Sequence, residues 1–342
     1  METKHNVYLL YKTRSDRSGF MSNYESYSKG VLYMSGYYAR RIVSALITIL
    51  LISSLTFIMM HAVPGGPFTR ERPVPDEILR TLNEKYNLDA SYFEQYVDYM
   101  KGLVTFDLGP SYSKVGTSVN DLLISGFPIS AKIGLFASVL IVVLGIPVGI
   151  ISALKQNKPI DYLVMFLATI GVTVPSFVMA TLIIYFFAGK LNWIPSFGVS
   201  DWRGYIGPVL ALSGYSLSFV ARLTRSSMLE VLQQDYIRTA RANGIREFKV
   251  IAKHAVKNAM IPVVTYIGPM VAAILTGSFV IEKIFALPGL GRHFIESITN
   301  RDYTTIMGMT IVYAVFYIIM IFLVDIAYGF IDPRIKLGKG KA

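Results

Sequence analysis

The residues that could carry chemistry are few, and their spacing argues against catalysis by this chain. The sequence has no cysteine and four scattered histidines. They are His5, His61, His254 and His293. None forms the HExxH pair of a zinc enzyme, and the Gly-Lys pairs at 189–190 and 338–339 lack the Ser or Thr that completes a P-loop. The sequence therefore predicts no enzyme activity, cofactor or metal site in this chain.

A basic segment between two apolar stretches is the strongest chemical signal. Residues 235–262 read DYIRTARANGIREFKVIAKHAVKNAMIP. Its positive side chains are Arg238, Arg241, Arg246, Lys249, Lys253 and Lys257. Apolar residues recur at helical spacing on both sides of Gly244, and Asn243–Gly244 suits a helix end followed by a sharp turn. The segment is predicted to be a helical hairpin. The residues leave open whether it binds a partner protein or lies on the anionic inner leaflet.

The composition indicates the kind of protein in which this hairpin lies. Of 342 residues, 53% are hydrophobic and 16% are charged, whereas a soluble domain has about 25% charged residues. This balance indicates a polytopic protein whose main surroundings are the lipid bilayer. The net charge of +11 could suggest a nucleic-acid ligand. We expect no nucleic acid, because excess Lys and Arg are typical of the cytoplasmic side of membrane proteins.

Six apolar stretches are long enough to cross a bilayer, which takes about 20 helical residues. They are residues 42–60, 133–154, 162–187, 205–220, 262–281 and 306–330. The predicted fold class is an all-α membrane protein with six transmembrane helices. Lys and Arg are denser in the segments before the first span, after the second, around the hairpin and after the last. The positive-inside rule then places both termini and the hairpin in the cytoplasm.

This orientation predicts a simple domain order. It is a tail at 1–41, a first span at 42–61, an extracytoplasmic loop region at 62–129, a core at 130–331 with five spans and a cytoplasmic coupling loop at 221–261, and a tail at 332–342. The loop region has helical spacing of apolar residues and is predicted to form short helices. Its acidic side chains could face a partner or simply form a solvated surface.

The spans offer hydroxyl groups and almost no fixed charge, which predicts a neutral translocation path. The candidate path residues are Thr169, Thr173, Ser176, Ser213, Ser216 and Thr276. Such hydroxyls also bond to carbonyls of their own helix, and small residues such as Gly145 and Gly149 allow close helix packing. A secondary transporter is disfavoured, because membrane-embedded carboxylates are its usual mark. Energy for transport is therefore expected from another subunit.

The basic segment resembles the cytoplasmic "EAA" loop of ABC importer permeases, in the form found in oligopeptide and dipeptide permeases. The resemblance extends from Tyr38 over nearly the whole chain. It includes PGGPF, FDLGPSY, ISALKQNKPID, ARLTRSSMLEVL, LTGSFVIEKIFALPGLG, SITNRDYTTIMG and YGFIDPRIK. One departure from the general importer pattern is that Arg238, Thr239 and Ala240 stand where Glu-Ala-Ala would begin. This puts in doubt any partner contact that would depend on the Glu.

The resemblance implies a type I ABC importer permease in a prokaryotic plasma membrane. It implies a second homologous permease subunit, two cytoplasmic ABC ATPases that hold ATP and Mg, and an extracytoplasmic peptide-binding protein. The implied cargo is an oligopeptide; a dipeptide, nickel, glutathione or a glycoside is the alternative. The residues implied to couple the permease to the ATPases are Asp235, Tyr236, Arg238, Thr239, Ala240 and Gly244.

Overall fold

The computed structural model describes residues 39–68, 75–275 and 278–331. Contacts divide the chain into a body, Ile52–Val324, and a second unit made of residues 1–51 and 325–342. In the second unit the described residues are the start of the first helix and the end of the last. The terminal tails expected at 1–41 and 332–342 lie outside the described residues, except that 39–41 begin the first helix.

Helices account for most of the described chain. The first runs over Ala39–Ala62. The others are α2 (Asp76–Lys85), α3 (Tyr92–Thr105), α4 (Val119–Leu154), α5 (Pro159–Thr173), α6 (Ser176–Ile183), η1 (Ile184–Lys190), η2 (Trp202–Tyr205), α7 (Ile206–Leu232), α8 (Asp235–Ala242), α9 (Glu247–Lys249), η3 (Val250–Ala255), α10 (Val256–Leu275), α11 (Phe279–Ile284), α12 (Leu290–Thr299) and α13 (Tyr303–Ile331). Among the described residues, five helices are long and apolar enough to cross a membrane, or six with one bent pair.

The third expected span, 162–187, is not a straight helix. It consists of α5 and α6–η1, which meet at an angle of 107°. Val174 is extended (φ −77°, ψ 121°), and Pro175 begins the next helix. Proline disfavours helical geometry in the residue before it and lacks an N–H for the helix ladder, so the helix ends there.

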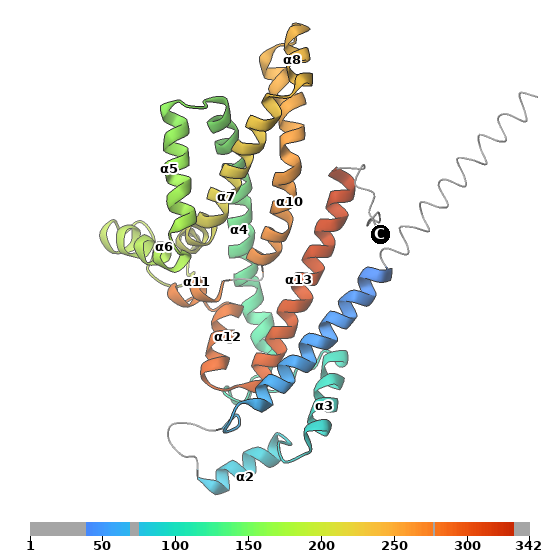
Figure 1. The fold of residues 1–342 in the computed structure, drawn as a ribbon. Coiled ribbons are helices and arrows are strands. Elements are labelled where there is room, and N and C mark those ends of the chain that lie inside the picture. Colours follow the sequence, from blue (N-terminus) through green and yellow to red (C-terminus); the bar gives the residue numbers. More distant parts are fainter. Residues whose placement is uncertain (1–38, 69–74, 276–277, 332–342) are drawn as a thin grey trace, which may run out of the picture. The chain divides into compact units, whose positions relative to one another are not determined.

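The body is built around α4, α7 and α10, which lie side by side in Figure 1. Glycines on α4 allow α7 to approach closely. A Cβ added at Gly149 would lie 2.5 Å from the carbonyl oxygen of Ala221, and one at Gly145 would lie 3.0 Å from Val220. The close packing expected from Gly145 and Gly149 is therefore confirmed as contact with α7.

The two ends of this helical core carry different structures. Figure 1 shows α8 at one end of α7 and α10, with α11 and α12 toward the other. Short helices α2 and α3 occupy the region expected to be a long loop, as its apolar spacing predicted. α4 also begins within that region, at Val119, where Ser118 caps it by accepting a hydrogen bond from the Asp121 N–H. The long loop is thus largely helical.

Candidate coupling site and the contacts that support it

The basic segment forms a helix–turn–helix at the end of α7. α8 is followed by a turn at Gly244, whose φ is 72°, in the left-handed region. The Gly244 N–H donates to the Arg241 carbonyl, and the Ile245 N–H donates to the Ala240 carbonyl, which closes the end of α8. The chain returns through α9 and the π-helical segment η3 into α10. The predicted hairpin is confirmed, with its turn at the predicted glycine.

An apolar core holds the hairpin against the end of the helical body. Ile237 and Ala240 of α8 are buried, and they share a cluster with Met228 of α7 and Val250 of η3. Ala240, one of the predicted coupling residues, is 8% exposed and packs in this core. Its part in coupling stays a prediction.

The remaining predicted coupling residues lie on the outer surface of α8 and its turn. Asp235, Tyr236, Arg238, Thr239 and Gly244 are exposed. Arg238 pairs with Asp235 at 3.5 Å, and the Thr239 hydroxyl donates to the Asp235 carbonyl. Tyr236 accepts a hydrogen bond from Asn258 Nδ2 at 2.7 Å, which ties α8 to α10. These residues form one accessible surface on a braced helix.

Phe248 is a feature of this surface that sequence reasoning did not single out. It lies at helical spacing with apolar neighbours, yet it is 83% exposed on α9. Basic residues Arg246 and Lys249 flank it and are exposed too. A large exposed aromatic residue beside positive charges is typical of a protein-binding surface. The hairpin thus presents an aromatic anchor in addition to the predicted polar residues.

A buried ion pair lies between α7 and α5, on the same side as the hairpin. Arg225 Nε and Nη2 donate to the two carboxylate oxygens of Asp161, at 2.6 and 2.7 Å. The hydroxyl of Ser152 on α4 and the N–H of Asn157 also donate to this carboxylate. Asp161 is 2% exposed. One carboxylate therefore joins three helices close to the base of α8.

The candidate path residues do not gather at one place among the described residues. Thr173 and Ser176 are exposed on the two sides of the α5–α6 bend. Ser213 and Ser216 are buried within α7, and the Ser213 hydroxyl donates to the Leu210 carbonyl. Thr169 donates to the Met165 carbonyl and accepts from Arg222. Thr276 lies outside the described residues. Their role in a path stays a prediction.

Two more buried carboxylates lie at the end of the body opposite the hairpin. Glu282 on α11 accepts hydrogen bonds from the Ser130 hydroxyl and the Gly291 N–H, so it joins α4, α11 and α12. Asp302, which precedes α13, accepts from the Ser111 hydroxyl and from the Tyr112 N–H. Burial alone would raise the pKa of Asp302. The hydrogen bonds that its carboxylate accepts outweigh this effect, so the pKa lies below its ordinary value. The carboxylate therefore holds the 111–113 loop while ionised.

These features define a polytopic helical membrane protein with an exposed helical hairpin at one end. Residues 145–337 match the family described as binding-protein-dependent transport system inner membrane component, and residues 34–130 match the N-terminal part of such membrane components. The chain belongs to this family and is a multi-pass membrane protein.

Relatives match over almost their whole length. A dipeptide transport system permease protein of Bacillus subtilis is 49% identical over 306 residues, which cover 90% of this chain and 99% of the relative. An oligopeptide transport system permease protein of Escherichia coli K12 is 43% identical over 302 residues, covering 87% and 98%. An inward-facing structure of a methionine ABC transporter shares the fold, with a TM-score of 0.51 at 15% identity over 62% of this chain and 96% of that one.

Proposed function

We propose that this protein is a permease subunit of an ATP-driven ABC importer that takes up short peptides. The observation that carries the proposal is the 49% and 43% identity to dipeptide and oligopeptide permease proteins over nearly full length. The proposed complex contains a second, homologous permease, two cytoplasmic ATPases that bind ATP and Mg, and an extracytoplasmic peptide-binding protein. Both termini and the hairpin face the cytoplasm in this arrangement.

The hairpin is the proposed docking element for one ATPase. Five predicted coupling residues are exposed on α8 and its turn, and Phe248 adds a large apolar side chain. The apolar core under Ile237 and Ala240 makes α8 move together with the ends of α7 and α10. A displacement of α8 by the ATPase would then reach α5 through Arg225 and Asp161. Closure of the two ATPases on ATP would shift the spans between two packings.

The region of α2 and α3 is the proposed contact for the peptide-binding protein. Tyr92 on α3 is 69% exposed, whereas Tyr96 hydrogen-bonds to Ser54 and packs on Phe57. A photoreactive residue at position 92, and not at 96, should therefore cross-link to the binding protein when ATP is present. Cross-links that reach only the second permease would instead make this region a spacer between the two permeases.

The test of the proposal is uptake by the purified complex in proteoliposomes. The complex, with a permissive binding protein, is given acidic, neutral and basic peptides of two lengths, with ATP inside or outside the vesicles. We expect uptake that requires ATP on the hairpin side and that proceeds at similar rates across the charge classes, because the spans offer hydroxyls rather than fixed charges. Uptake of nickel, glutathione or a glycoside in place of peptides would overturn the assigned cargo. Uptake without ATP would overturn the class.

A further inference from the structure

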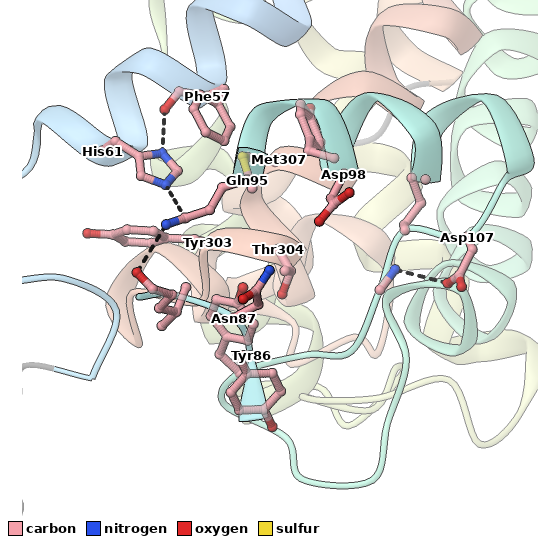
Figure 2. Close-up of a pocket in the computed structure, with 16 residues that line it drawn as sticks. Phe57, His61, Tyr86, Asn87, Gln95, Asp98, Asp107, Tyr303, Thr304 and Met307 are labelled. Carbon is pink, nitrogen blue, oxygen red and sulfur yellow. Dashed lines mark hydrogen bonds between the residues drawn. The ribbon is translucent and has the colours of Figure 1, made fainter. Parts of the chain in front are cut away.

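A cavity of about 170 Å³ lies where the end of the first helix meets α3, the 107–112 loop and the start of α13. Figure 2 shows the side chains that line it. Ligand pockets for drug-sized molecules measure about 300–1,000 Å³, so this cavity is too small for a folded peptide segment. Its volume suits a single long side chain or one end of a chain.

Six aromatic rings of the described chain line the cavity. The lining rings are Phe57, His61, Tyr86, Tyr99, Tyr112 and Tyr303. Tyr86 and Tyr112 lie 4.7 Å apart between centroids, and Phe57 and Tyr99 lie 6.0 Å apart. Burial raises the pKa of Tyr112, and the nearby Asp302 raises it further, so the phenol stays neutral. Neutral aromatic faces attract cations through their quadrupole.

The charged groups of the lining are carboxylates. They are Asp98 on α3 and Asp107 in the following loop, and within the described part of the chain neither Lys nor Arg lines the cavity. Figure 2 shows Asp98 projecting from α3 toward the part of the pocket where Asn87 and Thr304 lie. Asp107 accepts a hydrogen bond from the Gly109 N–H. Asp98 pairs with Lys101 at 3.2 Å, but both side chains are more than half exposed, and such pairs contribute little.

The polar wall beside these groups is fixed by its own hydrogen bonds. Gln95 Nε2 donates to the Leu88 and Ala90 carbonyls, which turns its Oε1 toward His61 Nε2 at 3.1 Å. The other ring nitrogen of His61 lies 2.9 Å from the Phe57 carbonyl. The Tyr303 hydroxyl is buried without a hydrogen-bond partner among the described residues. These bonds hold Gln95 and His61 in position, while the half-exposed Asp98 carboxylate remains accessible to a ligand.

One positively charged side chain lies near a ring of the aromatic wall, outside the cavity. Lys85 Nζ is 5.4 Å from the centroid of the Tyr86 ring, although Lys85 does not line the cavity. Aromatic faces combined with a carboxylate form the usual recognition site for an ammonium group. An anion would meet two carboxylates, and a neutral apolar group would offer no partner to the buried Tyr303 hydroxyl.

We propose that this cavity is a cation socket, which receives one primary ammonium or guanidinium group beside Asp98 and the Tyr86 ring. This inference rests on the proposed function, which places the socket on the extracytoplasmic side of the membrane. The cation then comes from the extracytoplasmic side, either as a Lys or Arg side chain of the binding protein or as the amino group of the transported peptide. The socket would orient the binding protein or the incoming end of the peptide at the entrance to the spans.

The absence of cysteine from the sequence allows a direct test. Thr304 lines the socket, and the variant Thr304→Cys places a thiol of similar size there. The whole complex is treated with aminoethyl or sulfonatoethyl methanethiosulfonate, and labelling of this subunit is followed by mass spectrometry. The variant Phe93→Cys gives the reference ratio of labelling by the cationic reagent to labelling by the anionic one. Phe93 suits this purpose because it is 77% exposed on α3 and lies outside the socket.

We expect the cationic reagent to be favoured at Thr304→Cys over the anionic one by at least about threefold relative to the reference. Propylammonium chloride should slow this labelling and propanol should not. Asp98→Asn and Tyr86→Leu should each abolish the preference, whereas Tyr86→Phe and the matched α3 variant Glu94→Gln should keep it. Equal labelling by the two reagents, or a preference that survives Asp98→Asn, would overturn the proposal.

Two further arms identify the source of the cation. Protection of Thr304→Cys by the binding protein alone assigns the socket to that protein. Protection by a free peptide, lost when its amino terminus is acetylated, assigns it to the cargo. Protection by neither would overturn a role in transport. The labelling test requires no transport, so it tests the socket independently of the proposed function. The proposed function is tested separately, by peptide uptake through the unmodified complex.

Discussion

Arg225 on α7 donates two hydrogen bonds to Asp161 at the start of α5, 64 positions earlier in the chain. Most of the bent third span lies between these two residues. The pair is more than a surface contact, because the side chain of Asp161 is 3% exposed and that of Arg225 is 22% exposed. It also lies within seven residues of the end of α7, where the hairpin begins. This position makes the pair a direct connection between the hairpin and α5.

Replacing Asp161 by Asn should destabilise the complex, because it removes the buried counter-charge of a partly buried guanidinium. Loss of one partner of a buried pair costs about 3–5 kcal/mol. The double variant Asp161→Leu, Arg225→Met should recover most of the thermal stability, since it removes both charges. We expect peptide-stimulated ATP hydrolysis to stay low in the double variant. Full recovery of stimulation would show that the pair serves stability alone.

Gly244→Val should weaken ATPase docking through the backbone of the turn. The space around Gly244 is open, with no atom within 4 Å of an added Cβ, so the effect comes from its φ of 72°. A β-branched residue held there costs about 1–3 kcal/mol, while Gly244→Asn, the control, tolerates this region. Co-purification of the ATPases should fall for Val and persist for Asn. Equal co-purification would contradict a requirement for this turn.

Phe248→Ala should weaken ATPase binding without lowering the stability of the permease. Phe248 is 83% exposed, so its truncation opens no cavity in the permease itself. An aromatic anchor at the centre of an interface contributes about 2 kcal/mol or more, which predicts a clear loss of affinity in a binding titration. Val115→Ala, at a residue that is 82% exposed and outside the hairpin, is the control. Unchanged affinity in Phe248→Ala would remove Phe248 from the interface.

Gly149→Val should separate α4 from α7 and reduce the amount of folded protein. An added Cβ would already lie 2.5 Å from the Ala221 carbonyl oxygen and 2.6 Å from Thr224 Cβ. Overpacking of this kind costs about 1–3 kcal/mol. Gly214→Ala on α7 is the matched control, since an added Cβ there meets nothing within 4 Å. Thermal unfolding in detergent should separate the two variants, and similar midpoints would argue against the close approach.

The sequence predicted the elements that depend on local pattern. Apolar length identified the spans, and Asn243–Gly244 identified the hairpin turn, because both signals lie within one short stretch. The α5–α6 bend was not predicted, although Pro175 was visible, because a proline is also compatible with a kinked, continuous span. The membrane environment and the residues packed around it decide between these two outcomes.

The contacts between residues that are far apart in the sequence could not be predicted from it. Asp161 follows a loop in the sequence, and nothing local indicates that Arg225 will bury it. The same holds for Asp302, whose partners Ser111 and Tyr112 lie far back in the chain. The cation socket is assembled from the first helix, α3 and α13, so its aromatic residues appear unrelated in the linear sequence. The exposure of Phe248 could not be predicted either, because periodicity does not say which face of a helix is covered.

The π-helical segment η3 joins the hairpin to α10, and its residue count specifies the rotation of one relative to the other. One residue of an α-helix corresponds to about 100° around the axis, and a π-helical turn accommodates one residue more than an α-turn. A deletion within 250–255 would therefore change the direction in which Phe248 on α9 points relative to α10. In the proposed complex, the length of η3 would then help to set which surface of an ATPase the hairpin meets.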